Sequence, residues 1–243
     1  MKKTSLILAA LAAGAGLNAQ DVKSSYSVTT DFTYASEYIF RGIEYAGNSF
    51  QPSIEISSGD AYLGIWTNQP ITKREANEID LYGGYKYKLN DALSFEAVGT
   101  YYWYPEATEA LGETDQSYEL GLGATYVYSG ISTSVYYYYD VRLKADTVQG
   151  SVGYSVPLEA IGSSVDFSVF YGTVDSRDAS PNALGFPVFE NYNYYGADVS
   201  VPYKLNDKAT LTAGVHYAAN ENLGNGSLPD SNLWFTIGLS VGF

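Results

Sequence analysis

The chain has 243 residues, 27 of them acidic and 13 basic, and the formal net charge of −14 argues against nucleic acid as a partner because phosphate would be repelled. It contains no cysteine and a single histidine, which excludes a disulfide scaffold, an iron–sulfur cluster, a cysteine nucleophile and a zinc site built on several histidines. Aromatic residues make up 16% of the sequence, which excludes a disordered chain. We expect no cofactor and no metal.

The N-terminal residues indicate an export signal. A short basic region, Met1–Lys3, precedes the apolar stretch Leu6–Ala15, which has the length of a signal-peptide core but is too short to cross a bilayer. We expect a signal peptide over residues 1–19, cleaved after Ala19, and a single mature domain over residues 20–243. Export and acidic charge together predict a bacterial envelope protein. With the strand pattern described below, we expect it to pass through the periplasm to the outer membrane of a Gram-negative-type bacterium.

The remaining sequence consists of short segments rich in Val, Ile, Thr, Tyr and Phe, separated by Gly, Asn, Asp, Ser and Pro. No stretch in it approaches 18 consecutive apolar residues, so we expect no transmembrane helix. Twelve strands are predicted, in chain order: Ser25–Arg41, Gln51–Ser57, Ala61–Asn68, Glu78–Lys88, Leu93–Tyr104, Ser117–Tyr128, Ile131–Leu143, Thr147–Val156, Ser164–Val174, Tyr192–Tyr203, Ala209–Ala219 and Asn232–Phe243. Ten strands remain the alternative if the second and third are split wrongly.

The connections between these strands alternate in length. Ser58–Asp60 and Asn206–Lys208 are examples of short connections made of tight-turn residues, whereas Pro105–Gln116 and Asn220–Ser231 are longer. The connection after Leu143 is short where a long one is expected. Transmembrane barrels have this asymmetry, with short periplasmic turns and longer outer loops.

Each predicted strand has one apolar face and one polar face. The charged residues of the strands all fall on the polar faces: Asp31, Glu37, Arg41, Glu55, Asp80, Lys86, Lys88, Glu96, Glu119, Asp140, Arg142, Asp166 and Asp198. A soluble sandwich or barrel would put the apolar face inside, and alternation alone does not decide between the two arrangements. We expect the apolar face outside, because the polar face is rich in glycine and serine and because tyrosines gather near strand ends, as in interfacial girdles.

These observations predict an all-β fold, a transmembrane up-and-down antiparallel β-barrel of about twelve strands. Unpaired backbone groups are expensive in hydrocarbon, so the first strand must pair with the last. The final strand closes on Phe243, a form suited to the barrel-assembly machinery, which we expect as a partner beside outer-membrane lipid and lipopolysaccharide. The oligomeric state is left open.

The segment Ser36–Ile43 (SEYIFRGI) is followed by Gln51-Pro52, by Tyr62–Trp66 (YLGIW) and by Glu78–Tyr85 (EIDLYGGY). Over roughly residues 25–105 this pattern resembles the TorF family of bacterial porins, whose functions are largely unknown. The resemblance implies an outer-membrane barrel with a channel role. It implies no catalytic residue and no particular substrate.

The candidate pore-lining residues lie on the polar faces of the strands: Asp31, Glu37, Arg41, Glu55, Asp80, Glu96, Glu119, Asp140, Arg142, Asp166, Asp198 and His216. Acidic groups dominate this set, and a negative lumen concentrates cations. We expect passive diffusion of small polar solutes with weak cation preference, or little preference if the carboxylates are neutralised by neighbours or protons. Arg41 and Glu37 form either a charged constriction near the outer mouth or part of a buried ion pair that closes the barrel.

Two other functions remain open. A barrel whose lumen is filled could serve as a non-conducting structural or surface-interaction protein. A barrel enzyme could use His216 as a base with Asp198 and with Ser200 or Ser240, although no Gly-x-Ser-x-Gly motif is present and we expect no enzyme. Inward aromatic residues form either a stacking path for sugars or nucleosides or a filling of the lumen: Trp66, Tyr82, Tyr102, Tyr136, Tyr138 and Trp234.

Overall fold

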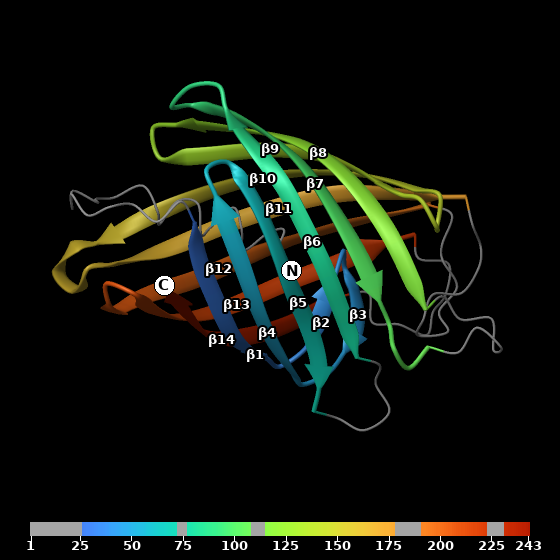
Figure 1. The fold of residues 1–243 in the computed structure, drawn as a ribbon, viewed down its shortest axis with the longest axis horizontal. Helices are drawn as coiled ribbons and strands as arrows, with labels where there is room; N and C mark the ends of the chain where they lie inside the picture. Colours follow the sequence, from blue (N-terminus) through green and yellow to red (C-terminus); the bar gives the residue numbers. More distant parts are fainter. Residues whose placement is uncertain (1–25, 72–76, 108–114, 178–190, 223–230) are drawn as a thin grey trace.

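The computed structural model describes residues 26–71, 77–107, 115–177, 191–222 and 231–243, so the expected signal peptide lies outside the described residues. Twelve strands close into one antiparallel barrel, in which β1 (Ser27–Ala35) pairs with β14 (Ser231–Gly242) and completes the circle (Figure 1). The predicted twelve-stranded barrel is therefore confirmed. Within the described ranges, no helix is long and apolar enough to span a membrane.

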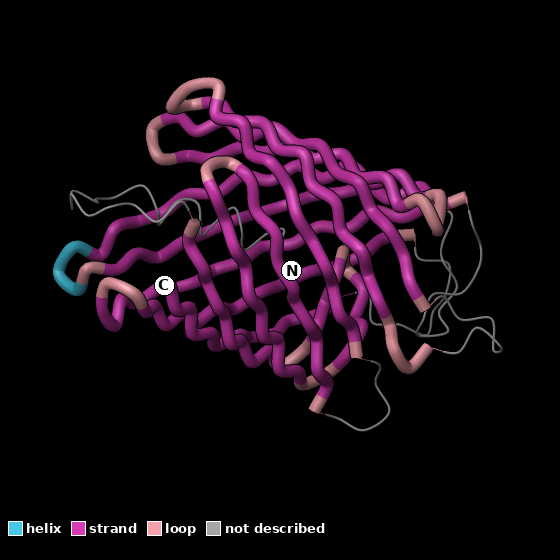
Figure 2. The backbone as a smooth tube through the Cα atoms, in the orientation of Figure 1, coloured by secondary structure: helices cyan, strands magenta, loops and turns pink. Residues whose placement is uncertain are grey.

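The other barrel strands follow in chain order, each paired with the next: β4 (Ser49–Ser58), β5 (Ala61–Pro70), β6 (Glu78–Lys88), β7 (Leu93–Trp103), β8 (Gln116–Tyr128), β9 (Ile131–Asp140), β10 (Ala145–Leu158), β11 (Ser163–Ser176), β12 (Asn191–Asn206) and β13 (Ala209–Glu221). The 3-10 turn η2 (Glu159–Ile161) connects β10 to β11, as Figure 2 shows. One end of the barrel carries the connections at residues 59–60, 89–92, 129–130, 159–162 and 207–208, and is termed the turn end. The opposite end is termed the loop end.

Local turn chemistry explains why the connections at the turn end are tight. The Asn90 side chain accepts hydrogen bonds from the backbone N–H groups of Ala92 and Leu93, and the Asn206 side chain does the same for Lys208 and Ala209. Ser129 and Gly130 both have positive φ, the geometry of a two-residue hairpin turn. These turns fix the register of the strand pairs that they join.

The outer surface of the barrel is apolar and the inner surface is polar. Leu122 and Leu233 are more than 60% exposed, whereas Ser134 and Ser168, whose side chains face inward, are less than 9% exposed. A soluble protein does not carry so broad an apolar band, whereas a transmembrane barrel turns such a band toward lipid. The expected sidedness of the strands is therefore confirmed.

The prediction of a single strand over Ser25–Arg41 is wrong. Strand β1 ends at Ala35, and the chain then turns into the barrel as a separate two-stranded sheet of β2 (Tyr38–Phe40) and β3 (Ile43–Ala46) (Figure 1). Arg41 and Gly42 join these strands with φ of 51° and 77°, and a two-residue turn with both angles positive matches the twist of a hairpin. Residues 38–46 are termed the inner hairpin.

Candidate channel lumen and its inner hairpin

The inner hairpin lies at the loop end, and its aromatic side chains pack against the inner faces of β5 and β7. The Tyr38 and Trp66 rings have centroids 5.4 Å apart, and the Phe40 and Tyr102 rings 6.3 Å apart. Tyr38 also shares a buried cluster with Tyr82 of β6. This contact explains why large aromatic residues occur on an inner face that is otherwise polar.

The aliphatic residues of the inner hairpin pack against the opposite wall. Ile39 forms a buried cluster with Ala218 of β13 and Trp234 of β14. The cluster around Ile43 brings in residues from β10, β11 and β12: Ala145, Val174, Tyr192 and Tyr194. The hairpin thus directs apolar side chains to several sides, because the barrel wall surrounds it, and it lies across the lumen at this level. Of the inward aromatic residues of the wall, five lie against the hairpin: Trp66, Tyr82, Tyr102, Tyr138 and Trp234.

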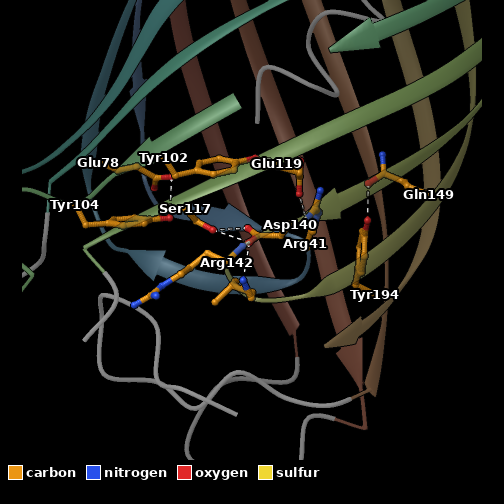
Figure 3. Close-up of polar contacts among 11 residues, drawn as sticks. Arg41, Glu78, Tyr102, Tyr104, Ser117, Glu119, Asp140, Arg142, Gln149 and Tyr194 are labelled. Atoms are coloured by element: carbon orange, nitrogen blue, oxygen red, sulfur yellow. Dashed lines mark hydrogen bonds and ion pairs between the residues drawn. The ribbon is translucent and has the colours of Figure 1, made fainter. Parts of the chain in front are cut away.

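The tip of the inner hairpin is held by a buried ion pair and by one backbone contact. Arg41 Nη1 lies 2.7 Å from Glu119 Oε2 of β8, and the two side chains are 11% and 2% exposed (Figure 3). The Arg41 guanidinium also lies over the Phe40 and Tyr138 rings. On the other side of the tip, Asn220 Nδ2 donates to the Gly42 carbonyl oxygen at 2.7 Å. In this arrangement the Arg41 charge is enclosed by protein.

Gly42 is required at the tip for two reasons. Its positive φ disfavours residues with a Cβ, and a Cβ built there would lie 2.8 Å from the Ala219 carbonyl oxygen and 2.9 Å from Tyr194 Cβ. The Arg41-Gly42 pair therefore combines a turn signal with a close approach to the barrel wall.

The loop end also holds carboxylates that accept hydrogen bonds from hydroxyl groups. Tyr104 Oη donates to Glu78 at 3.2 Å, and Tyr102 Oη donates to Glu119 at 3.2 Å (Figure 3). Tyr104 lies beyond the end of β7, and burial, followed by the nearby charge of Glu78, raises the pKa of its phenol. Asp80 of β6 is buried on the same inner surface.

Arg142 and Glu37, which were predicted to lie on the polar faces of strands, both lie outside strands in the structure. Strand β9 ends at Asp140 rather than at Leu143, so Arg142 lies in the β9–β10 connection and its side chain is exposed. Asp140 holds that connection in place, because it accepts hydrogen bonds from Ser117 Oγ and from the backbone N–H groups of Arg142 and Leu143 (Figure 3). Glu37 precedes β2, and burial raises the pKa of its carboxyl group.

Toward the turn end, the interior contains carboxylates that accept hydrogen bonds from hydroxyl groups of the adjacent strand or of the strand beyond it. Glu96 accepts hydrogen bonds from Tyr62 Oη at 2.6 Å and from Tyr136 Oη at 2.5 Å, and Glu55 accepts one from Tyr82 Oη at 3.0 Å. The same pairing joins Ser53 to Asp31, Ser155 to Asp166 and Ser168 to Asp198. A hydroxyl donor contributes a hydrogen bond and no positive charge, which distinguishes these pairs from the ion pair at the loop end.

His216 lies in a short hydrogen-bonded row in the middle of the lumen wall. Its Nδ1 is 2.7 Å from Asp198 Oδ1, its Nε2 is 2.9 Å from Thr236 Oγ1, and its ring stacks on Trp234. Asp198 therefore meets His216 as the sequence suggests, but the hydroxyl partner is Thr236 rather than Ser200 or Ser240. A Cβ at Gly214 would lie 2.7 Å from His216 Nε2, so the missing side chain makes room for this row.

The comparisons with known proteins agree with this architecture. Residues 19–137 match the model of a family described as bacterial protein of unknown function (Gcw_chp). A search of curated proteins gave no match.

Among solved structures, the fold is similar to that of the KdgM porin (TM-score 0.56, 13% identity, 88% of this chain and 99% of that chain). It is also similar to the NanC porin (TM-score 0.55, 12% identity, 88% and 98%) and to an outer membrane channel from Pseudomonas putida F1 (TM-score 0.54, 10% identity, 94% and 100%). At these identities the likeness establishes a shared fold, the closed barrel of outer-membrane porins and channels.

Proposed function

We propose that the protein is an outer-membrane channel that lets small hydrophilic solutes diffuse passively, with a weak preference for cations. The observation that carries the proposal is the acidic lumen inside an apolar cylinder. Porins and channels with the same fold support it. On this proposal the chain is exported through the periplasm and inserted by the barrel-assembly machinery, and lipid and lipopolysaccharide surround it.

The cation preference follows from how the carboxylates of the lumen are paired. Glu55 and Glu96 accept hydrogen bonds from tyrosines, which are neutral, and Asp31 and Asp166 accept them from serines. Arg41 offsets one charge, that of Glu119, at the loop end. A negative interior of low dielectric raises the local concentration of cations and lowers that of anions.

Reversal potentials across a planar bilayer in a potassium chloride gradient test this proposal. For the wild type we expect a reversal potential whose sign indicates preference for potassium over chloride. The double variant Glu55→Gln/Glu96→Gln should give a smaller reversal potential of the same sign. The matched control is Glu159→Gln, which removes an exposed carboxylate in η2 outside the strands and should leave the potential unchanged. Clear anion preference of the wild type would refute the proposed selectivity.

A non-conducting structural or surface-interaction barrel is the second candidate, because the inner hairpin fills the loop end of the lumen. Single-channel recordings separate the two functions. Discrete conductance steps from the purified protein support the channel, whereas a bilayer that stays silent with the wild type and with a variant lacking the hairpin supports the structural barrel.

A membrane enzyme is the third candidate, and the Asp198–His216–Thr236 row is the observation that favours it. The row has the order carboxylate, imidazole and hydroxyl, as in a catalytic triad. However, Thr236 sits within a strand that pairs with β13 on one side and β1 on the other, so its neighbouring backbone N–H groups are engaged in the sheet rather than free to form an oxyanion hole. Lipase and protease assays on the wild type and on His216→Ala decide this point.

A further inference from the structure

The inner hairpin joins the barrel only through the two ends of its own segment. Residues 36–37 connect it to β1 and residues 47–48 to β4, and among the described residues its two strands form a sheet separate from the barrel. Below it, Ala35 of β1 pairs directly with Ser49 of β4, so the barrel wall is continuous without the hairpin. The wall therefore holds the hairpin by side-chain packing, by the Arg41–Glu119 ion pair and by Asn220, and not by a strand ladder.

The docked position of the hairpin combines favourable and unfavourable contacts. Burial of Tyr38, Ile39 and Ile43 stabilises it. Against this, the Arg41 and Glu119 charges have both been withdrawn from water, which offsets much of their attraction. Three buried polar atoms at the same level have no hydrogen-bond partner among the residues that the structure describes: Glu37 Oε2, Arg41 Nη2 and Trp234 Nε1. Water would satisfy all three if the hairpin left the lumen, so docked and undocked positions compete.

The hairpin also occupies the place where closure would be most effective. Its contacts reach from Trp66 of β5 through Glu119 of β8 to Trp234 of β14, so that it bridges opposite walls at the loop end. The carboxylate–hydroxyl pairs of the turn end lie on the other side of it. A solute that crosses the lumen must pass this level.

We propose that the inner hairpin is the gate of the channel, which closes the loop end when docked and opens it by swinging outward on Glu37 and Gly47, next to Ser36 and Asn48, whose backbone groups bond to the wall. The proposal rests on the channel function and adds its regulation. It assigns Arg41 and Glu119 as the latch that holds the closed state, and Gly42 as the residue that lets the tip reach β13.

A reversible cross-link tests the gate, because the chain has no cysteine of its own. Ile39→Cys/Ala218→Cys places one thiol on the hairpin and one on the wall within the same buried cluster. Single-channel recordings are made before oxidation, after oxidation and after reduction in the same bilayer, and loss of both free thiols by mass spectrometry confirms the bridge. The two single-cysteine variants are the controls, and neither should respond to oxidant.

We expect oxidation to abolish the conductance steps and reduction to restore them. A second variant, in which residues 37–47 are replaced by Gly-Gly, keeps the paired ends of β1 and β4 and should stay open, with unit conductance several-fold above that of the wild type. Equal currents in the bridged and reduced states overturn the gate.

The remaining outcomes separate the gate from the channel itself. A silent wild type with a conducting hairpin-deleted variant means that the hairpin is a fixed plug, which overturns the gate and leaves the channel lumen standing. Equal conductance of the wild type and the deletion also overturns it. Silence from every variant, with folding shown by heat-modifiable gel mobility, refutes the proposed channel function.

Discussion

The two halves of the lumen differ in how their charges are accommodated, although strands of the same alternating pattern enclose both. At the loop end the Arg41–Glu119 pair is enclosed by aromatic and aliphatic side chains, as in the core of a soluble protein. Toward the turn end the carboxylates of Glu55 and Glu96 meet tyrosine hydroxyl groups that reach them across one intervening strand. The difference shows that alternation decides where a side chain points, whereas a segment outside the wall decides whether the interior is packed or polar.

The largest effect is expected when one partner of the buried ion pair is removed. Glu119→Leu leaves the Arg41 charge buried and unpaired, a change that typically costs about 3–5 kcal/mol, so the hairpin should leave its docked position. The measurement is the rate at which a maleimide labels a cysteine introduced as Ile43→Cys, the single thiol of that background.

Removing both charges is the control for this prediction. Arg41→Met/Glu119→Leu should return the labelling rate toward that of the parent, because a hydrophobic pair of similar volume replaces the ions. Labelling of Glu119→Leu at the parent rate would contradict the role of the ion pair in holding the hairpin.

A smaller loss is expected from Gly42→Ala. A left-handed residue with a Cβ costs roughly 1–2 kcal/mol, and the contact with the Ala219 carbonyl oxygen adds to this. Gly59→Ala is the matched control, since Gly59 also has positive φ but a Cβ there has nothing within 4 Å. Urea unfolding in phospholipid vesicles measures the free energy of unfolding of both variants. Equal losses would show that the close approach of the hairpin tip to β13 does not add to the cost of Gly42→Ala.

Substitutions in the turn-end half of the lumen should lower the free energy of unfolding only slightly and should not affect the docking of the hairpin. Tyr62→Phe and Tyr136→Phe each remove one hydrogen bond to Glu96, for which we expect losses of about 0.5–1.5 kcal/mol in the free energy of unfolding. Tyr126→Phe, on the exposed outer face of β8, is the control. An increase in maleimide labelling at position 43 in either variant would mean that the two halves are not independent.

The smallest effect is expected from Glu37, and it depends on pH. Burial raises the pKa of its carboxyl group, so the folded protein binds a proton there more readily than the unfolded chain. Docking of the hairpin should therefore weaken slightly as the pH rises through that pKa. Glu37→Gln should flatten this dependence in the labelling assay, and an unchanged slope would exclude Glu37 as its source.

The strands could be predicted from the sequence because their information is local. Alternation in Leu233–Val241 and the turn residues at Asn90 and Asn206 each depend on a few neighbouring side chains. The inward direction of Glu55, Asp166 and other carboxylates follows from the same alternation. The direction of these side chains could therefore be predicted without knowing which distant residues they contact.

The inner hairpin could not be predicted in the same way, although a signal was present. Tyr38 and Phe40 continue the alternation of β1, which hides the end of that strand at Ala35. The Arg41-Gly42 turn between two short apolar segments is the feature that indicates a hairpin. Its ion pair with Glu119, 78 positions away, depends on the hairpin entering the lumen, which no local pattern encodes.

The same limit applies to His216. Its partner in the neighbouring strand depends on how β13 and β14 are aligned, and Thr236, which is paired with Gly214 rather than directly with His216, is the hydroxyl within reach. The candidates Ser200 and Ser240 lie on the correct face but out of place: Ser240 pairs with Thr210, nearer the turn end, and Ser200 pairs with Gly214 from the β12 side, across β13 from Thr236.

The direct pairing of Ala35 with Ser49 has a consequence for how such a protein changes over evolution. Because the wall is complete beneath the insertion, mutations between these two residues can alter the length or chemistry of the inserted segment while the cylinder stays intact. Related barrels could therefore diverge in what they admit by exchanging this one stretch of about a dozen residues, and a designer could do the same with a grafted sequence.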